Sequence, residues 1–137
     1  MIVRDIMSTD VVKVSTLDTI EKTAQLMKQH NIGSIPVCDH NSVVGIVTDR
    51  DIALRSVASG QNTNKQQVSS IMSTDCTFGK PDMDVSDASR IMSEKQIRRL
   101  PIVENDNLIG IVALGDISLE TSTQDNAEDA LKNISKS

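Results

Sequence analysis

The sequence predicts an α+β fold built from two tandem repeats, each with the order strand, helix, strand, strand, helix, packed together with pseudo-two-fold symmetry. The first observation behind this prediction is an internal alignment without gaps, in which residues 3–55 match residues 68–120 at a constant offset of 65. The second is that short β-branched runs alternate with apolar stripes of helical period inside each copy. The third is that an apolar run ends in polar groups twice, as GIVTDRD at residues 45–51 and as GIVALGD at residues 110–116.

The first repeat begins with a β-branched stretch at residues 11–14, which predicts a short strand. Asp18, with Glu21 three residues later, has the form of a capping box and predicts a helix over residues 19–30. Apolar residues recur on one face of this helix, and charged or amide residues occupy the other. The apolar stripe is Ile20, Ala24 and Met27, and the polar face is Glu21, Lys22, Gln25 and Lys28.

The rest of the first repeat predicts a hairpin followed by a second helix. Apolar runs at residues 35–38 and 43–48 predict two paired strands, because the polar residues 39–42 between them favour a turn. The second helix is expected to begin near Asp49 and to stop at Gly60.

The second repeat has the same order, with a hairpin turn at residues 105–107 and a last helix that begins around Ile117 and Leu119. Its first helix carries an apolar stripe of Val85, Ala88, Ile91 and Met92. The predicted domains are repeat one at 1–60, a polar linker at 61–67, repeat two at 68–123 and a C-terminal tail at 124–137. The tail residues whose spacing allows a short helix are Ala127, Ala130, Leu131 and Ile134.

Each repeat alone is too short to bury a core large enough for stable folding, because chains of this size bury only about 60% of their surface. We therefore expect the two copies to fold as one unit and to cover each other's sheets. Clefts would then lie between the copies and occur in pairs.

Composition argues against several partners and compartments. The net charge is -5 and Phe78 is the only aromatic residue, which disfavours nucleic acid because binding there relies on cations and aromatic stacking. The longest apolar run, residues 108–114, is far too short to span a bilayer, so no membrane association is expected and the predicted location is the cytoplasm. Cys38 and Cys76 have no metal-binding spacing, and we interpret both as reduced core thiols. His30 and His40 lack plausible metal partners, so no metal site is predicted.

The repeated motifs identify a family resemblance. IMSTD begins each copy, IGSIPV and IRRLPI are the proline-bearing strands, and GIVTDRD and GIVALGD form the strand-to-helix turns. On these motifs residues 1 to about 120 resemble the tandem cystathionine beta-synthase (CBS) domain pair, in particular small stand-alone bacterial proteins with one pair. The resemblance implies a regulatory module without catalytic residues and without a required cofactor. It would bind an adenosine-containing ligand (AMP, ADP, ATP or S-adenosylmethionine) between the repeats.

The resemblance also implies site residues. Asp51 would accept hydrogen bonds from the ribose hydroxyls, Thr48 would help to hold the ribose or phosphate, and Ile46 would lie against the base. An ionised carboxylate suits a vicinal diol, and the exposed N–H groups of the helix start would attract a phosphate. The opposite repeat would complete the site with Met72, Thr77 and Ile97, and with Arg98 or Arg99 near a phosphate.

A second cleft is expected to be weaker or empty. Asp116 and Ile111 persist there, but Ala113 cannot donate a hydrogen bond, and Arg99 would have to compensate. The opposite wall would contribute Val12, Ile32 and Gly33.

The residues leave simpler alternatives open. Thr48 and Asp51 have the form of a capping box, which often does nothing beyond capping a helix, although Asp116 persists where Ala113 cannot cap. Arg98 and Arg99 can equally be solvated surface charges. The alternative function is therefore a structural or interaction protein of the same fold that binds no ligand.

Assembly is predicted from the second helix of each repeat. The faces carrying Ile52, Val57, Ile117 and Leu119 exceed what one packed pair can cover, which favours a homodimer. An unidentified effector protein would read out ligand occupancy.

Overall fold

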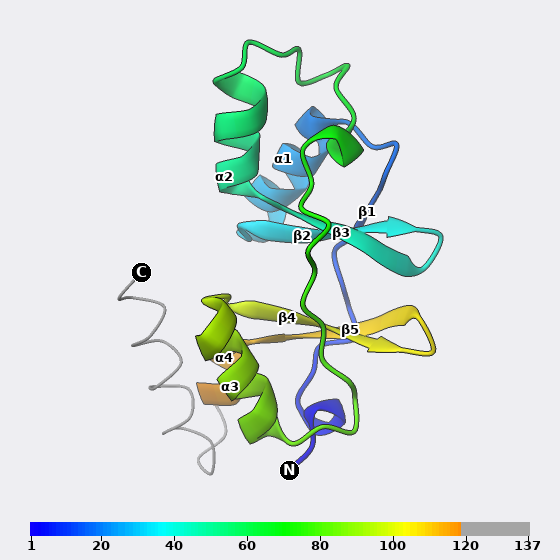
Figure 1. The fold of residues 1–137 in the computed structure, drawn as a ribbon, viewed down its shortest axis with the longest axis vertical. Helices are drawn as coiled ribbons and strands as arrows, with labels where there is room; N and C mark the ends of the chain where they lie inside the picture. Colours follow the sequence, from blue (N-terminus) through cyan, green and yellow to red (C-terminus); the bar gives the residue numbers. More distant parts are fainter. Residues whose placement is uncertain (119–137) are drawn as a thin grey trace. The chain divides into compact units, whose positions relative to one another are not determined.

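A computed structural model describes residues 1–118. The chain divides into two compact units, which do not coincide with the two sequence repeats (Figure 1). Unit 2 is the continuous segment Val12–Cys76, and within the described residues unit 1 combines Met1–Val11 with the chain from Thr77 onward. The predicted helix in the tail lies outside the described residues.

Unit 2 contains a three-stranded sheet in the order β1-β2-β3. Strand β1 pairs parallel with β2, and β2 pairs antiparallel with β3. The stretch at residues 11–14 was predicted as a strand, but pairing begins only at Val14, so this prediction was wrong for residues 11–13. The elements are β1 (Val14–Ser15), α1 (Ile20–His30), β2 (Ser34–Asp39), β3 (Ser42–Thr48), α2 (Asp49–Ile52), a π-helical turn η2 (Ala53–Val57) and a 3-10 turn η3 (Val68–Ser70).

Unit 1 contains the hairpin of β4 and β5, whose irregularity lies between Ile102 and Val103. The irregularity of the β2–β3 hairpin lies between Val37 and Cys38, at the equivalent position of the other repeat. The tight turn between β4 and β5 uses Asn105 and Asp106, both with positive φ. The elements of unit 1 are a 3-10 turn η1 (Val3–Asp5), α3 (Val85–Lys95), β4 (Arg99–Glu104), β5 (Asn107–Ala113) and α4 (Leu114–Ser118).

Helix α1 and its cap each begin one residue later than predicted. Thr19 is the N-cap and accepts a hydrogen bond from Lys22 N, whereas the carboxylate of Asp18 accepts from Ser15 N and Lys22 Nζ. The predicted pairing of Asp18 with Glu21 was therefore wrong, because the neighbouring threonine is equally able to cap. Burial raises the pKa of Asp18, but these two hydrogen bonds and the Lys22 charge lower it more, so the net pKa is below its ordinary value.

Residues 61–67, predicted as a linker, complete this helix start. The carbonyl of Gln66 accepts from Ile20 N, and that of Thr63 accepts from Glu21 N. A helix leaves its first N–H groups without intrahelical acceptors, so the segment supplies what α1 lacks. The segment therefore caps α1 through its backbone as well as connecting the repeats.

The buried faces of α1 and α3 differ slightly from the predicted stripes. On α1, Thr23 is fully buried while Ala24 is half-buried. On α3, Ser89 is buried while Ile91 is half-buried. The four predicted polar residues of α1 are exposed, as expected.

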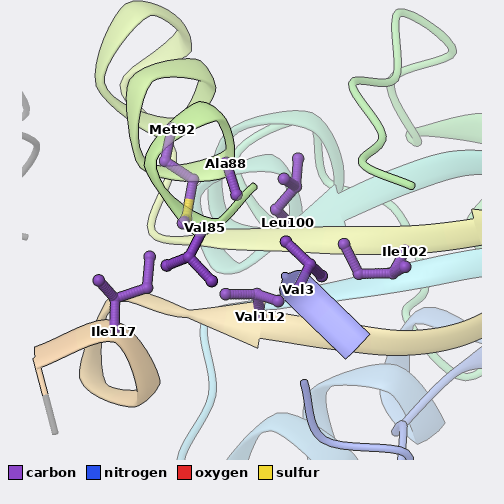
Figure 2. Packing of buried hydrophobic residues seen from close by; sticks show 8 residues of the cluster. All are labelled: Val3, Val85, Ala88, Met92, Leu100, Ile102, Val112 and Ile117. Atoms are coloured by element: carbon purple, nitrogen blue, oxygen red, sulfur yellow. The ribbon is translucent and has the colours of Figure 1, made fainter. Parts of the chain in front are cut away.

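Two hydrophobic cores are present, and each takes residues from both sequence repeats. Val3, from the start of repeat one, is fully buried in the core of unit 1 beside α3, β4 and β5 (Figure 2). Val68 and Ile71, from the start of repeat two, are buried in the core of unit 2. The beginning of each repeat therefore completes the core of the other.

One residue predicted for an exposed dimer face is buried instead. Ile117 is fully buried in the core of unit 1, where Figure 2 shows it beside Val85 and Val112, so its assignment to such a face was wrong. On unit 2, Val57 is 61% exposed and its neighbour Leu54 is 52% exposed. Leu119 lies outside the described residues. No helix among residues 1–118 is long and apolar enough to cross a membrane.

Candidate ligand-binding site

The GIVTDRD turn joins β3 to α2 in unit 2 and closes on itself as a capping box. Thr48 Oγ1 accepts a hydrogen bond from Asp51 N at 3.1 Å, and Asp51 Oδ2 accepts one from Thr48 N at 3.0 Å. Thr48 and Asp51 therefore do cap a helix, as the simpler interpretation of the sequence holds.

The first N–H groups of α2 are already occupied. Asp49 N donates to the carbonyl of Gly33 at 2.9 Å, Arg50 N donates to Asp49 Oδ1 at 2.8 Å, and Asp51 N donates to Thr48. The predicted attraction of a phosphate to exposed N–H groups was wrong, because the first N–H groups of α2 already donate to acceptors within the protein. A ligand phosphate at this turn would need a side-chain cation.

Within residues 1–118, the capping box leaves two polar groups of the turn available. Thr48 Oγ1 is used as an acceptor, so its hydroxyl hydrogen remains to donate. Asp51 Oδ2 is used, whereas Oδ1 has Arg55 Nε at 3.8 Å as its nearest charged partner among the described residues. The Asp51 side chain is 18% exposed and Thr48 is half-buried. The turn thus offers one donor and one acceptor at a partly accessible position.

Ile46 and Met72 lie close to this turn in the same unit. Ile46 N donates to Ser73 O at 2.9 Å, and Ser73 N donates back to Ile46 O at 2.8 Å, which fixes residues 72–73 beside β3. A Cβ at Gly45 would lie 2.4 Å from Met72 Sδ, so the methionine side chain lies directly on the glycine. Ile46, Thr48, Asp51 and Met72 therefore all lie in unit 2, because the start of repeat two belongs to that unit, and their membership of one ligand site stays a prediction.

Three residues predicted for the second cleft also lie in unit 2. Gly33 is beside the GIVTDRD turn, since a Cβ there would lie 3.0 Å from Asp49 Oδ2. Val12 and Ile32 are partly buried against the unit 2 core. They therefore share a unit with Asp51 rather than with Asp116.

The remaining predicted residues lie in unit 1, around the GIVALGD turn. Asp116 Oδ2 accepts from Ala113 N at 3.0 Å, which is half of a capping box. Arg99 is the strand partner of Ala113, and the carbonyl of Arg98 accepts from Leu114 N at 3.1 Å. Ile111 is buried, while Ile97 and Thr77 are half-buried.

The half-box of Asp116 changes one inference from the sequence. Asp116 persists opposite Ala113, which indicated that the aspartate has a purpose beyond the reciprocal pair. In the structure this purpose is structural, because the carboxylate of Asp116 accepts a hydrogen bond from Ala113 N without needing a hydroxyl in return. The aspartate alone is therefore weak support for a ligand, and the hydroxyl of Thr48 is the stronger signal.

Arg55 was missed in the sequence. It follows Asp51 by four residues and so falls on the same helical face, a signal that was available from spacing. Arg55 Nη1 also donates to the carbonyl of Ile71 at 3.3 Å.

The two cysteines are free thiols, Cys38 buried and Cys76 half-buried. Burial raises the pKa of the thiols of Cys38 and Cys76, which keeps both protonated at neutral pH and disfavours reactivity. Residues 1–118 contain no group of three or more His, Cys, Asp or Glu side chains that could hold a metal ion.

Comparison with known proteins gives consistent matches. The CBS domain family model matches residues 3–57 and 68–120. The CBS domain-containing protein YhcV of Bacillus subtilis (strain 168) is 50% identical over 133 residues, which cover 97% of this chain and 94% of that protein.

Solved structures agree. Hypoxic Response Protein I, crystallised with two coordinated zinc ions, gives a TM-score of 0.80 at 30% identity and covers 88% of this chain and 98% of that chain. The CBS domain pair of protein MJ0100, in complex with 5′-methylthioadenosine and S-adenosyl-L-methionine, gives a TM-score of 0.74 at 30% identity and covers 87% of this chain and 94% of that chain. The two matched segments and these neighbours establish that the chain belongs to the CBS domain family and carries two consecutive CBS domains in an α+β fold.

Proposed function

We propose that this protein is a regulatory sensor that binds an adenosine-containing ligand in unit 2 at the GIVTDRD turn. Asp51 and Thr48 hold the ribose, and Ile46 and Met72 lie against the base. The ligand is AMP, ADP, ATP or S-adenosylmethionine, and its occupancy is passed to an effector protein in the cytoplasm. The chain itself performs no catalysis.

The observation that carries this proposal is the pair of groups that the capping box leaves unused. A ribose diol offers hydroxyls that both donate and accept, and Asp51 Oδ1 with the Thr48 hydroxyl matches that need. Hydrogen bonds to a charged acceptor are worth about 1.5 to 3 kcal/mol each. Capping and ligand binding use different atoms of the same two residues, so the first does not exclude the second.

The comparison with MJ0100 supports the ligand class, because that CBS domain pair was crystallised with two adenosine derivatives at 30% identity to this chain. The involvement of Thr77, Ile97, Arg98 and Arg99 in the same site stays a prediction, since these residues belong to unit 1.

A weaker second site is proposed around Asp116 and Ile111. Asp116 Oδ2 accepts from Ala113 N, but Ala113 has no hydroxyl to donate to a ribose. Arg99, the strand partner of Ala113, is the cation nearest in register to the missing hydroxyl.

A purely structural function is the second candidate, favoured by the capping box that closes without any ligand. Thermal unfolding with AMP, ADP, ATP and S-adenosylmethionine separates the two. A ligand at 100 times its Kd stabilises the folded state by about 2.7 kcal/mol. We expect at least one of these ligands to raise the melting temperature at millimolar concentration, and an unchanged melting temperature with all of them would favour the structural function.

We also propose that the protein forms a homodimer. Leu54 and Val57, which are 52% and 61% exposed on the helical segment after Asp51, support an apolar contact. Sedimentation at micromolar concentration is expected to give a dimer, and Val57→Glu is expected to shift it toward the monomer. A monomer for the unchanged chain would contradict this proposal.

A further inference from the structure

Arg55 lies one helical turn after Asp51, on the segment where α2 continues as the π-helical turn Ala53–Val57. Its guanidinium reaches two groups of unit 2. Nε lies 3.8 Å from Asp51 Oδ1, and Nη1 donates to Ile71 O at 3.3 Å. Arg55 thus stands between the aspartate of the turn and the segment that carries Met72.

Neither interaction explains Arg55 as a stabilising residue. The separation of 3.8 Å is too long for a charged hydrogen bond, and the 3.3 Å bond is at the long end of the range for N–H···O. The side chain is 58% exposed, and ion pairs at such exposure contribute little to stability. A guanidinium has five donors, and most of those of Arg55 have no protein acceptor within the described residues.

The first backbone N–H groups of this turn are not free for a phosphate near Asp51. The N–H groups of Asp49, Arg50 and Asp51 are all occupied by protein acceptors. Asp49 and Asp51 also add negative charge that opposes an anion. A phosphorylated ligand therefore needs a cation close to Asp51, and a guanidinium binds phosphate through two parallel hydrogen bonds.

The other copy differs at this position. Residue 120 is the equivalent of Arg55 at the offset of 65 and is a glutamate. The sequence thus places a cation one helical turn after Asp51 and a carboxylate at the corresponding position after Asp116.

We propose that Arg55 is the residue that makes the Asp51 site selective for phosphorylated adenosine ligands over unphosphorylated ones. Arg55 binds a phosphate of the ligand while Asp51 and Thr48 hold the ribose. The assignment rests on the proposed function, because it requires that the ribose bind at Asp51. It narrows the ligand class to a nucleoside phosphate.

The test is calorimetric titration of the full-length protein with AMP and with adenosine, which differ only in the phosphate. The unchanged chain should bind AMP about 10- to 100-fold more tightly than adenosine, as expected for charged hydrogen bonds. Arg55→Gln should remove most of that difference by weakening AMP, while adenosine affinity stays within about twofold. Arg90→Gln removes an exposed arginine of α3 in unit 1 that also pairs with an aspartate of its own helix, and it is the matched control, expected to leave both affinities unchanged.

Several outcomes overturn the assignment. Equal weakening of AMP and adenosine by Arg55→Gln would make Arg55 structural, and no weakening of either would exclude it from the site; in both cases the proposed function survives. If the unchanged chain binds neither compound at millimolar concentration, the assignment of Arg55 fails, and the proposed function fails with it if ADP, ATP and S-adenosylmethionine do not bind either. Should Arg55→Gln unfold, Arg55→Lys keeps the charge but loses the two-pronged geometry, and it must still weaken AMP more than adenosine.

Discussion

The two strand-to-helix turns begin with the same GIV and end with the same aspartate, but they differ in what surrounds that aspartate. In unit 2 the box is reciprocal, since Thr48 and Asp51 each accept from the other's backbone. In unit 1 only Asp116 accepts, because Ala113 has no side-chain oxygen. The aspartate is thus common to both turns for a structural reason, and the residues that differ carry the information about a ligand.

The cations around the two turns also come from different places. Unit 2 has Arg55 on the helix side, with Gly33 and Ser34 at the start of the neighbouring strand. Unit 1 has Arg98 and Arg99 at those strand positions instead. A duplicated turn has therefore kept its backbone hydrogen bond and changed its charges, which is what two sites with different ligand preferences would need.

The largest expected effect concerns the division into units rather than repeats. A fragment of residues 12–76 keeps the whole core of unit 2, whereas residues 1–60 lack Val68 and Ile71. Each of these buried side chains contributes about 1.5 to 3 kcal/mol, a large share of the 5 to 15 kcal/mol that stabilise a domain. Circular dichroism should show cooperative thermal unfolding for 12–76 and none for 1–60, and equal melting of the two fragments would contradict the exchanged cores.

The second effect compares the two glycines of the turns. A Cβ at Gly110 would meet Met7 Sδ at 2.6 Å and Ser8 O at 3.0 Å, whereas a Cβ at Gly45 would meet only Met72 side-chain atoms, the nearest at 2.4 Å. A methionine can shift more easily than a backbone carbonyl that is paired with Ile111. Gly110→Ala should cost about 2 to 3 kcal/mol and Gly45→Ala about 1 to 2, within the usual range for overpacking. Urea unfolding of both variants measures this order, and the reverse order would show that the backbone contact does not matter.

The third effect exchanges the hydroxyl between the turns. Thr48→Ala should destabilise the protein by about 1 kcal/mol, the usual cost of losing an N-cap. Ala113→Thr should stabilise it by up to about 1 kcal/mol by completing the box with Asp116. Chemical denaturation of the two variants and of the double variant checks both signs, and a destabilising Ala113→Thr would mean that unit 1 has no room for the reciprocal bond.

The smallest effect is a pH dependence that separates the caps of α1 and α3. Thr19 caps α1, but Asp84 caps α3, and hydrogen bonds from the backbone N–H and hydroxyl of Ser86 hold the pKa of Asp84 below its ordinary value of 3.8. Because the folded pKa is the lower one, the cap contributes fully above pH 3.8 and its contribution is lost as the pH falls through the folded value. Asp84→Asn should therefore lose less stability than the unchanged chain between pH 6 and about pH 2.5. Parallel loss in the two proteins would exclude Asp84 as the titrating cap.

Most of the order of elements and both hairpins could be predicted from the sequence because they depend on short-range patterns. The expected first strand of repeat two was wrong, because Gly79 forms only an isolated bridge with Ile102 before α3. Turn residues 39–42 and 105–107 interrupt apolar runs, and the observed strands begin and end within a residue or two of the predicted ones. The repeat itself follows from identity at a constant offset. None of this requires knowledge of what packs against what.

The features that could not be predicted depend on distant partners. Val3 and Val68 are each buried in a core formed mainly by the other repeat, and nothing local in the sequence tells which repeat buries them. Asp18 and Thr19 are neighbours and are equally suitable as the N-cap of α1. Only the structure shows that Thr19 is the cap. The occupied N–H groups of α2 depend on the carbonyl of Gly33, which lies on another segment of the chain.

Replacement of Asp51 by asparagine tests the central claim most directly, because the amide oxygen can still accept the hydrogen bond of Thr48 N while the charge is lost. Calorimetry with AMP should show affinity about 10- to 100-fold weaker for Asp51→Asn, with a melting temperature close to that of the unchanged chain. Asp116→Asn should weaken AMP less. Equal losses at the two positions, or unchanged affinity in Asp51→Asn, would contradict the account and leave the GIVTDRD turn as a helix cap alone.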